Sequence, residues 1–206
     1  MTSFYDRHVL PQVVDLICGM PSFQKARAEL LPQASGNILE IGIGTGRNLP
    51  FYKPAQVHCV CGIDPGLHPR AKKRAAQAGL MLTAMPVTAE CIPADDNSFD
   101  CAVCTFSLCT IPDPAAALLE MRRVLTPQGK LLFAEHGRAA DDSVRRWQDR
   151  LTPVWSAIGG GCHLNRDIPS LLMAAGFSIT QLKAGYVAGP RFLSYFYSGI
   201  ATATAR

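Results

Sequence analysis

The fold of this chain is decided by the stretch Asn37-Ile-Leu-Glu-Ile-Gly-Ile-Gly-Thr-Gly-Arg-Asn48. Its first half is an apolar run, which predicts a buried strand of a parallel sheet. Glycines follow at positions 42, 44 and 46. Because glycine adopts positive φ and has no side chain to block a ligand, they predict a tight turn that brings bare backbone close to one. The stretch therefore predicts a strand, then this turn, and then a helix.

The spacing of these glycines separates two classes of cofactor. A dinucleotide site has the pattern G-x-G-x-x-G, which requires a third glycine at the position of Arg47 when counted from Gly42. The observed pattern is G-x-G-x-G behind Glu40, which suits S-adenosylmethionine, a cofactor that brings no phosphate to the turn. The next apolar run ends in Asp64, and a carboxylate at this place can accept hydrogen bonds from both ribose hydroxyls.

Four segments resemble class I S-adenosylmethionine-dependent methyltransferases, in the order expected of that family and over roughly residues 35 to 136. They are Glu40-Ile-Gly-Ile-Gly-Thr-Gly46, Gly62-Ile-Asp-Pro65, Asn97-Ser-Phe-Asp100 and Arg123-Val-Leu-Thr-Pro-Gln-Gly-Lys130. Within that family the chain looks most like the small thiol S-methyltransferases of the microsomal type and their bacterial relatives. The segments that carry this closer resemblance are Val103-Cys-Thr-Phe-Ser-Leu-Cys109, Ala134-Glu-His136 and Gly161-Cys-His-Leu-Asn-Arg166.

The predicted fold is α/β, a Rossmann-like and mainly parallel sheet of seven strands with helices on both faces. Strand-like and helix-like stretches alternate from 37 to 175, which favours parallel strands joined by crossover helices. A break at Gly189-Pro190 separates two closing strands and predicts a hairpin whose last strand, about 192 to 204, runs antiparallel. Length and an apolar content of 48 per cent indicate a single domain over residues 1–206.

Two segments flank the cofactor half of that domain. Residues 1–34 contain two short amphipathic stretches, which the resemblance makes a helical lid over the cofactor and which plain packing helices explain equally well. Residues 137–176 form an acceptor-side insertion and loop, with a helix about Asp141 to Ile158 that breaks at Pro153. Asn165 or Asp167 is expected to cap the helix that follows.

The resemblance also implies a set of cofactor-binding residues. One position departs from the family: many relatives have an Asp that binds the adenine amino group where this chain has Thr88. Adenine recognition is therefore assigned to backbone groups or to Glu90. The full set expected to bind S-adenosyl-L-methionine is Tyr5, Glu40, Gly42, Gly44, Gly46, Asp64, Pro65, Ala89, Glu90, Thr105 and Cys109.

Methyl transfer to a thiol needs positioning and a group that promotes thiolate formation. A free thiol has a pKa near 8.5 and imidazole titrates near pH 6.5, so histidine suits the task. His136 is expected at a strand end beside Glu135, which is a candidate to orient it, and His163 lies in a glycine loop near Arg166. His136 and His163 are therefore the candidate catalytic residues.

Three functions are compatible with these features. The first is methyl transfer to the sulfur of a small thiol or hydrogen sulfide, with aromatic side chains as pocket material. The second is methylation of another acceptor, either a phospholipid or small amine nitrogen or a quinone-precursor carbon, since the cofactor half is indifferent to the acceptor. The third is a cofactor-binding module without catalysis. The aromatic candidates are Trp147, Trp155, Phe192, Tyr195 and Phe196.

Composition narrows the partners to a small-molecule methyl acceptor. Only 17 per cent of residues are charged and the net charge is +4, too weak and dispersed to indicate nucleic acid. The eight cysteines show no pair of C-x-x-C motifs, so no metal site is expected, and they fit a reducing cytoplasm. The sequence predicts neither a signal peptide nor stable membrane insertion. It leaves peripheral membrane contact and the oligomeric state open.

Overall fold

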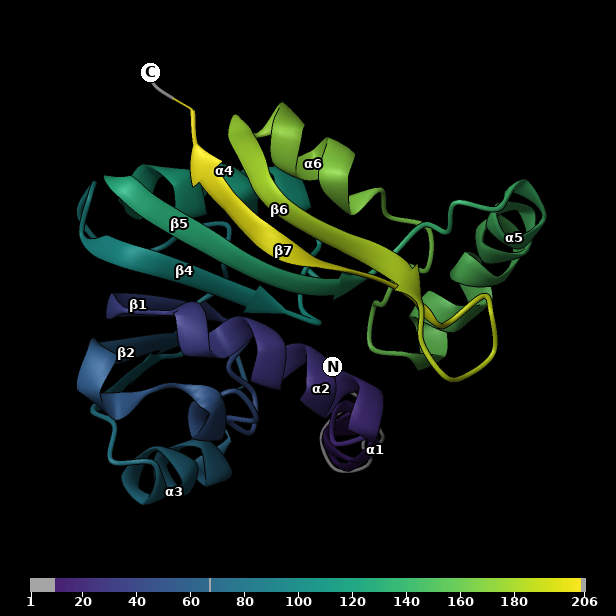
Figure 1. Ribbon diagram of the computed structural model, residues 1–206. Coiled ribbons are helices and arrows are strands. Elements are labelled where there is room, and N and C mark those ends of the chain that lie inside the picture. Colours follow the sequence, from purple (N-terminus) through teal and green to yellow (C-terminus); the bar gives the residue numbers. More distant parts are fainter. Residues whose placement is uncertain (1–9, 67, 205–206) are drawn as a thin grey trace.

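A computed structural model describes residues 10–66 and 68–204. Its centre is a seven-stranded sheet in the order β3-β2-β1-β4-β5-β7-β6 (Figure 1). Neighbouring strands from β3 across to β5 pair in parallel, and β7 pairs antiparallel with both β5 and β6. The predicted Rossmann-like sheet with an antiparallel last strand is confirmed. The strands are β1 Gly36–Ile41, β2 Val57–Ile63, β3 Leu82–Met85, β4 Phe99–Thr105, β5 Leu125–His136, β6 Phe177–Tyr186 and β7 Tyr195–Ala203.

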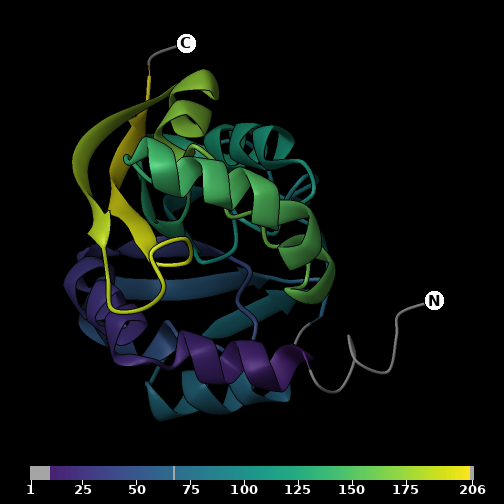
Figure 2. The same ribbon diagram turned by 90° about the vertical axis from the view of Figure 1, so that its right-hand side faces the viewer.

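Helices cover both faces of this sheet (Figures 1 and 2). Leu118 of α4 and Leu172 of α6 belong to the apolar core on one face. Leu30 of α2 and Ala71 of α3 belong to the core on the other. The helices are α1 Leu10–Cys18, α2 Pro21–Leu30, α3 Pro69–Gln77, α4 Pro114–Val124, α5 Asp142–Ile158 and α6 Ile168–Ala174.

The strand order places a switch point between β1 and β4. These strands are neighbours, with Ile41 beside Cys104, while β1 continues to β2 on one side and β4 to β5 on the other. Connections that leave in opposite directions open a crevice at the carboxyl ends of two such strands, where ligands bind in open α/β sheets. Figure 2 looks onto this end of the molecule and shows α1 and α5 crossing it.

The prediction of a helix after the glycine turn is wrong. Two short 3₁₀ helices, Leu49–Phe51 and Pro54–Gln56, occupy the connection between β1 and β2. Each has a proline in its first turn, and proline inside a longer helix would remove a backbone hydrogen bond and clash with the preceding turn. Residues 86–98, between β3 and β4, likewise contain no helix. These two crossovers depart from the predicted alternation of strand and helix.

Strand β5 contains an irregularity near its start. Phe99 pairs with Leu125 and Cys101 with Lys130, so residues 126–129 form an irregularity within one continuous strand rather than a turn that precedes it. Such extra residues bend a strand and increase its twist without ending it.

The break predicted at Pro153 is also wrong, because α5 continues through it to Ile158. Gln148, one turn before the proline, is fully buried. Its amide donates to the carbonyl of Gly137 at 3.0 Å and accepts from the backbone of Ala139 at 2.9 Å. These tertiary bonds hold α5 in place where the proline leaves one helical bond unmade.

Helix ends follow the predicted capping chemistry. Asp113 accepts hydrogen bonds from Ala115 and Ala116 at the start of α4. Of the two candidate caps for α6, Asp167 accepts from Ser170, whereas Asn165 donates to Asp149 of α5. The described residues include no helix that is long and apolar enough to cross a membrane.

Candidate active site

The glycine turn follows β1 at the switch point. The φ angles are 67° at Gly42, 50° at Gly44 and 78° at Gly46, a conformation that side chains rarely allow. A Cβ atom at Gly42 would lie 2.1 Å from Oγ of Ser107, whereas one at Gly44 would meet nothing closer than 3.8 Å. Gly44 therefore borders open space, which leaves room for a ligand against the turn.

Asp64 stands at the end of β2 beside this space. Its Oδ2 accepts the N–H of Gly44 at 2.8 Å, and its Oδ1 accepts the N–H of Gly66 at 2.7 Å. A carboxylate oxygen has a second lone pair, so each can still accept one hydrogen bond. This arrangement fits the two ribose hydroxyls of S-adenosylmethionine. Pro65 follows and is exposed.

Helix α1 is tied to the glycine turn through Asp15. The Asp15 carboxylate accepts from Thr45 Oγ1 at 2.5 Å and from Arg47 at 2.8 and 2.6 Å. Arg70 and Arg74 approach it within 3.4 and 3.5 Å. The Arg47 hydrogen bond, more than any other cause, holds the pKa of Asp15 well below its usual range. These contacts place α1 against the turn, and Tyr5 lies outside the described residues.

A buried polar network lies next to the turn. Glu40 accepts from the Tyr52 hydroxyl at 2.7 Å, and burial raises the pKa of Glu40 to about 7. Asn48 donates to Thr105 Oγ1 at 3.0 Å and accepts from Arg27 Nε at 2.8 Å. The predicted cofactor residues Glu40 and Thr105 are thus buried among protein partners, where they brace the turn.

The predicted adenine-binding residues follow β3. Ala89 is buried in the apolar core, so its backbone is the part that remains for a ligand. Glu90 accepts from the backbone N–H of Asp113 at 3.3 Å, which directs this carboxylate toward the start of α4. Thr88 is exposed.

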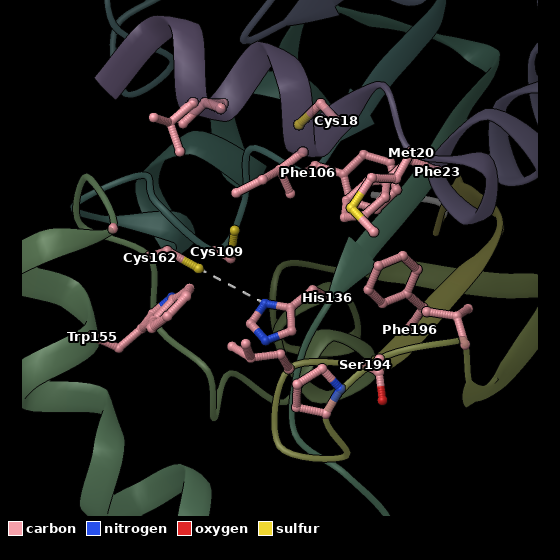
Figure 3. Close-up of a pocket in the computed structure, with 18 of the residues that line it drawn as sticks. Cys18, Met20, Phe23, Phe106, Cys109, His136, Trp155, Cys162, Ser194 and Phe196 are labelled. Carbon is pink, nitrogen blue, oxygen red and sulfur yellow. Dashed lines mark hydrogen bonds between the residues drawn. The ribbon is translucent and has the colours of Figure 1, made fainter. Parts of the chain in front are cut away.

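A cavity of about 460 Å³ opens at the same end of the sheet. Its walls come from α1 and the start of α2, from the carboxyl ends of β4 and β5, from α5 with its following loop, and from the connection between β6 and β7. Figure 3 shows these side chains surrounding a common space. The residues that line it include Val13, Ile17, Cys18, Met20, Phe23, Phe106, Cys109, His136, Trp155, Cys162, Ser194 and Phe196.

Three aromatic rings form one wall of this cavity. The ring of Phe23 lies 4.5 Å from that of Phe106 and 5.0 Å from that of Phe196, and the latter two are 5.3 Å apart. Phe106 has a φ of 54°, which is uncommon for a bulky residue and costs conformational energy. The backbone accepts this strain directly after β4, where it directs the ring into the cavity wall.

Two cysteines and a histidine form a cluster in the cavity wall. Nδ1 of His136 lies 3.8 Å from Sγ of Cys162, drawn as the dashed line in Figure 3. Cys109 lies beside them. The Cys109 thiol is the main cause of a lowered pKa at Cys162. His136 lowers this pKa further, whereas burial acts in the opposite direction. The pKa of Cys109 is raised, first by its hydrogen bond with Cys162 and then by burial.

The expected contact between Glu135 and the His136 ring is absent from the described structure. Glu135 Oε1 instead accepts the backbone N–H groups of Ser107 and Leu108 at 3.1 Å each, and the Cys104 thiol at 3.4 Å. Successive residues of a strand point to opposite faces of the sheet, so Glu135 is directed away from its neighbour. Complete burial raises the pKa of Glu135 to about 7.

The second predicted catalytic residue, His163, is not among the residues that line the cavity. Its Nδ1 lies 2.8 Å from the carbonyl of Gly161 and 3.3 Å from Nη2 of Arg166. Arg166 also donates to the carbonyl of Leu108. These contacts anchor the glycine loop to the end of β4, so that Cys162 rather than His163 faces the cavity.

Sequence reasoning found some wall residues and missed others. Of the five aromatic candidates, Trp155 and Phe196 line the cavity, whereas Trp147 is 57 per cent exposed. Cys162 was missed as a site residue although it adjoins His163 in the quoted glycine loop. Phe23 was missed because nothing in a short amphipathic stretch shows which strand end it covers.

Comparison with known proteins identifies the family. Residues 20–182 match the methyltransferase domain family, which covers most of the chain. This chain belongs to the S-adenosylmethionine-dependent methyltransferases. The methyltransferase is 37 per cent identical to thiol S-methyltransferase TMT1B of Rattus norvegicus over 71 per cent of its own length. It is 33 per cent identical to thiol S-methyltransferase TMT1A of Homo sapiens over 77 per cent of its length.

The methyltransferase spans less than two thirds of these relatives, 62 per cent of the rat protein and 66 per cent of the human one. Among solved structures, it is similar to the 1,6-didemethyltoxoflavin-N1-methyltransferase of Burkholderia thailandensis. That structure contains bound 1,6-didemethyltoxoflavin and S-adenosylhomocysteine. The TM-score is 0.67 at 17 per cent identity, over 94 per cent of this chain and 83 per cent of that one. This likeness supports the fold.

Proposed function

We propose that this methyltransferase transfers a methyl group from S-adenosylmethionine to the sulfur of a small, apolar thiol or of hydrogen sulfide. The observation that carries the proposal is the chemistry of the cavity wall. The described residues that line it include no Asp, Glu, Lys or Arg. Its polar side-chain groups are thiols, the hydroxyls of Thr110 and Ser194, the indole N–H of Trp155 and the imidazole of His136. Similarity to two thiol S-methyltransferases supports the same acceptor.

The wall disfavours charged acceptors. An alkylamine with a pKa near 10 enters as a cation at neutral pH, and burial of an unpaired charge is costly. A phospholipid phosphate prefers Arg or Lys. A neutral thiol avoids both costs. It also suits a cavity of about 460 Å³, within the usual range for small-molecule sites.

Each part of the site has a defined task in this proposal. S-adenosylmethionine supplies an electrophilic methyl group when it is bound along Gly44 and Asp64. The rings of Phe23, Phe106 and Phe196 exclude water from the acceptor, which removes the solvation that weakens a nucleophile. His136 takes the proton of the acceptor thiol, because the residue lines the cavity and its Nε2 has no hydrogen-bond partner among the described residues. The sulfur lone pair then forms the new S–C bond.

We further propose that residues 1–34 act as the lid over the cofactor and that residues 137–176 shape the acceptor side. For the lid, support comes from the contacts of Asp15 with the glycine turn. For the acceptor side, it comes from Trp155 and Cys162 in the cavity wall. A cytoplasmic location is part of the proposal, and the eight cysteines with free thiols suit a reducing compartment.

One observation favours a second acceptor class. Rings can bind organic cations by cation–π attraction, so the three phenylalanines give N-methylation of a small amine some support. Phe106 already faces Arg27, at 5.2 Å from the guanidinium carbon to the ring centre, which leaves less of this surface for a ligand. Transfer of labelled methyl groups to a panel of thiols and amines of matched size distinguishes the two. Preference for amines would exclude the thiol assignment.

A further inference from the structure

The cluster of Cys109, His136 and Cys162 has the composition of a metal site. The three residues come from different parts of the chain: the segment after β4, the end of β5 and the loop between α5 and α6. Their ligand atoms all lie within 4.8 Å of one another. No short sequence motif links them, which explains why the spacing of the cysteines predicted no metal.

Their geometry is close to that of tetrahedral zinc. With Zn–S near 2.3 Å and Zn–N near 2.0–2.1 Å, neighbouring ligand atoms in a tetrahedron are about 3.5–3.8 Å apart. The Nδ1 of His136 and Sγ of Cys162 are already 3.8 Å apart. The remaining separations within the cluster need to shrink by about 1 Å at most.

The surroundings of the cluster have two features of an open metal site: a fourth position free of protein ligands, and shielding of the ligand residues from water. All three residues line the cavity, and the other described cysteine that lines it, Cys18, lies outside their cluster, so it offers no fourth protein ligand. Cys109 and His136 are almost fully buried, so water competes weakly for these positions. Three protein ligands with one open position are typical of catalytic rather than structural zinc, and two cysteines with one histidine form one of the known sets.

We propose that Cys109, His136 and Cys162 bind one Zn²⁺ ion whose fourth position opens into the acceptor cavity. Soft thiolate ligands with imidazole select Zn²⁺ over Mg²⁺ or Ca²⁺. This site goes beyond the methyltransferase family assignment and uses only residues of this chain.

The use of the fourth position rests on the proposed thiol acceptor. The acceptor R–SH would lose its proton to solvent and bind the ion through sulfur as R–S⁻. A lone pair of that sulfur forms the S–CH₃ bond, and the electron pair of the broken bond stays on the sulfur of the methyl donor. The product R–S–CH₃ is a neutral and weaker ligand, so it leaves. In the zinc-bound state the ion takes over from His136 the task of favouring the thiolate.

Metal binding is measured on the full chain without methyl donor or acceptor. Protein reduced and freed of metal is titrated with Zn²⁺ in competition with a chromophoric chelator, and Co²⁺ is used in parallel for its thiolate charge-transfer absorption. We expect one ion per chain and a thiolate–Co²⁺ band. Cys162→Ser and His136→Ala should each weaken binding at least about tenfold, because each removes a ligand.

Cys91→Ser and Cys59→Ser are the matched controls, since both cysteines lie outside the cluster and the cavity. Wild-type affinity in Cys162→Ser, or equal losses in the controls, would overturn the proposal. So would a Cys109–Cys162 disulfide that persists under the reducing conditions of the titration. Thermal unfolding midpoints show whether a variant remains folded. Because the readout needs no acceptor, zinc binding without thiol turnover would contradict the proposed function and leave the metal site standing.

Discussion

Arg47 of the glycine turn and Asp15 of α1 form a two-pronged ion pair, with Nε–Oδ1 at 2.8 Å and Nη2–Oδ2 at 2.6 Å. The pair joins α1 to the glycine turn after β1. Its side chains are 24 and 11 per cent exposed, so solvent screens it only in part. Through this contact, α1 is joined to the turn that we propose binds the cofactor.

The first prediction concerns this contact. Asp15→Asn should weaken S-adenosylmethionine binding about fivefold, since a partly exposed pair contributes about 1 kcal/mol. Calorimetric titration measures the change. Glu29→Gln, which removes the exposed pair with Lys183, is the matched control and should bind as the wild type does. Equal affinity for S-adenosylmethionine in both variants would show that the contact of α1 with the turn does not contribute to cofactor binding.

Asp15 also makes the stability of the fold depend on pH. The pKa of Asp15 is lowered in the folded protein, so its contribution to stability is fully present above the unfolded pKa, near 3.9. It is lost as the pH falls through the lower folded value. The free energy of unfolding, measured from pH 6 down to pH 3, should therefore fall more in the wild type than in Asp15→Asn. Parallel curves for the two proteins would contradict this.

The second prediction concerns Asp64. Asp64→Ala should weaken S-adenosylmethionine binding at least about tenfold, because each charge-assisted hydrogen bond contributes about 1.5–3 kcal/mol. Asp100→Ala is a suitable control. That carboxylate also accepts a backbone N–H, from Asn37 at 2.8 Å, but at the amino end of β1. Wild-type affinity in Asp64→Ala would remove this residue from the site.

The third prediction uses the buried carboxyl of Glu135. Its pKa is raised to about 7 by burial, so the stability gained in its neutral form is fully present below the unfolded pKa near 4.3. That stability is lost as the pH rises through about 7. Between pH 5 and pH 8 the wild type should lose unfolding free energy on the order of 3 kcal/mol through this group, and Glu135→Gln should not show that loss. Denaturant unfolding at several pH values tests this, and an unchanged pH dependence in the variant would refute it.

The fourth prediction compares the two tryptophans. Trp155 lines the cavity, whereas Trp147 on the same helix is mostly exposed. Trp155→Ala should raise KM for an aromatic thiol about tenfold through lost apolar contact, and Trp147→Ala should leave it unchanged. Steady-state kinetics on both variants check this. Similar effects of the two substitutions would point to helix stability rather than acceptor contact.

The sheet could be predicted from the sequence because its strands are local apolar runs with clear ends. The stretch around Gly42 and Asp64 identified the switch point and the cofactor. The helix after the turn was mispredicted because the glycine pattern indicates only the turn. The connection that follows is short, and Pro50 and Pro54 exclude a helix from it.

The acceptor side was harder to predict, since it is assembled from distant segments. His136 was identified from its place at a strand end. The face of the sheet on which its neighbour Glu135 lies depends on the pleat of the strand. The proximity of Cys109 and Cys162 depends on the contact of Arg166 with Leu108. Such tertiary contacts leave no local pattern in the sequence.

Turnover of an alkanethiol and of the alkylamine of equal length, at pH 7 and pH 9, tests the central claim most directly. The wild type should methylate the thiol and leave the amine nearly untouched at pH 7. His136→Ala should lower thiol turnover about 10²–10⁴-fold at pH 7, with partial recovery at pH 9 because solution then supplies thiolate. His163→Ala, outside the cavity wall, should change it far less. Faster turnover of the amine, or an unaltered rate in His136→Ala, would contradict this account.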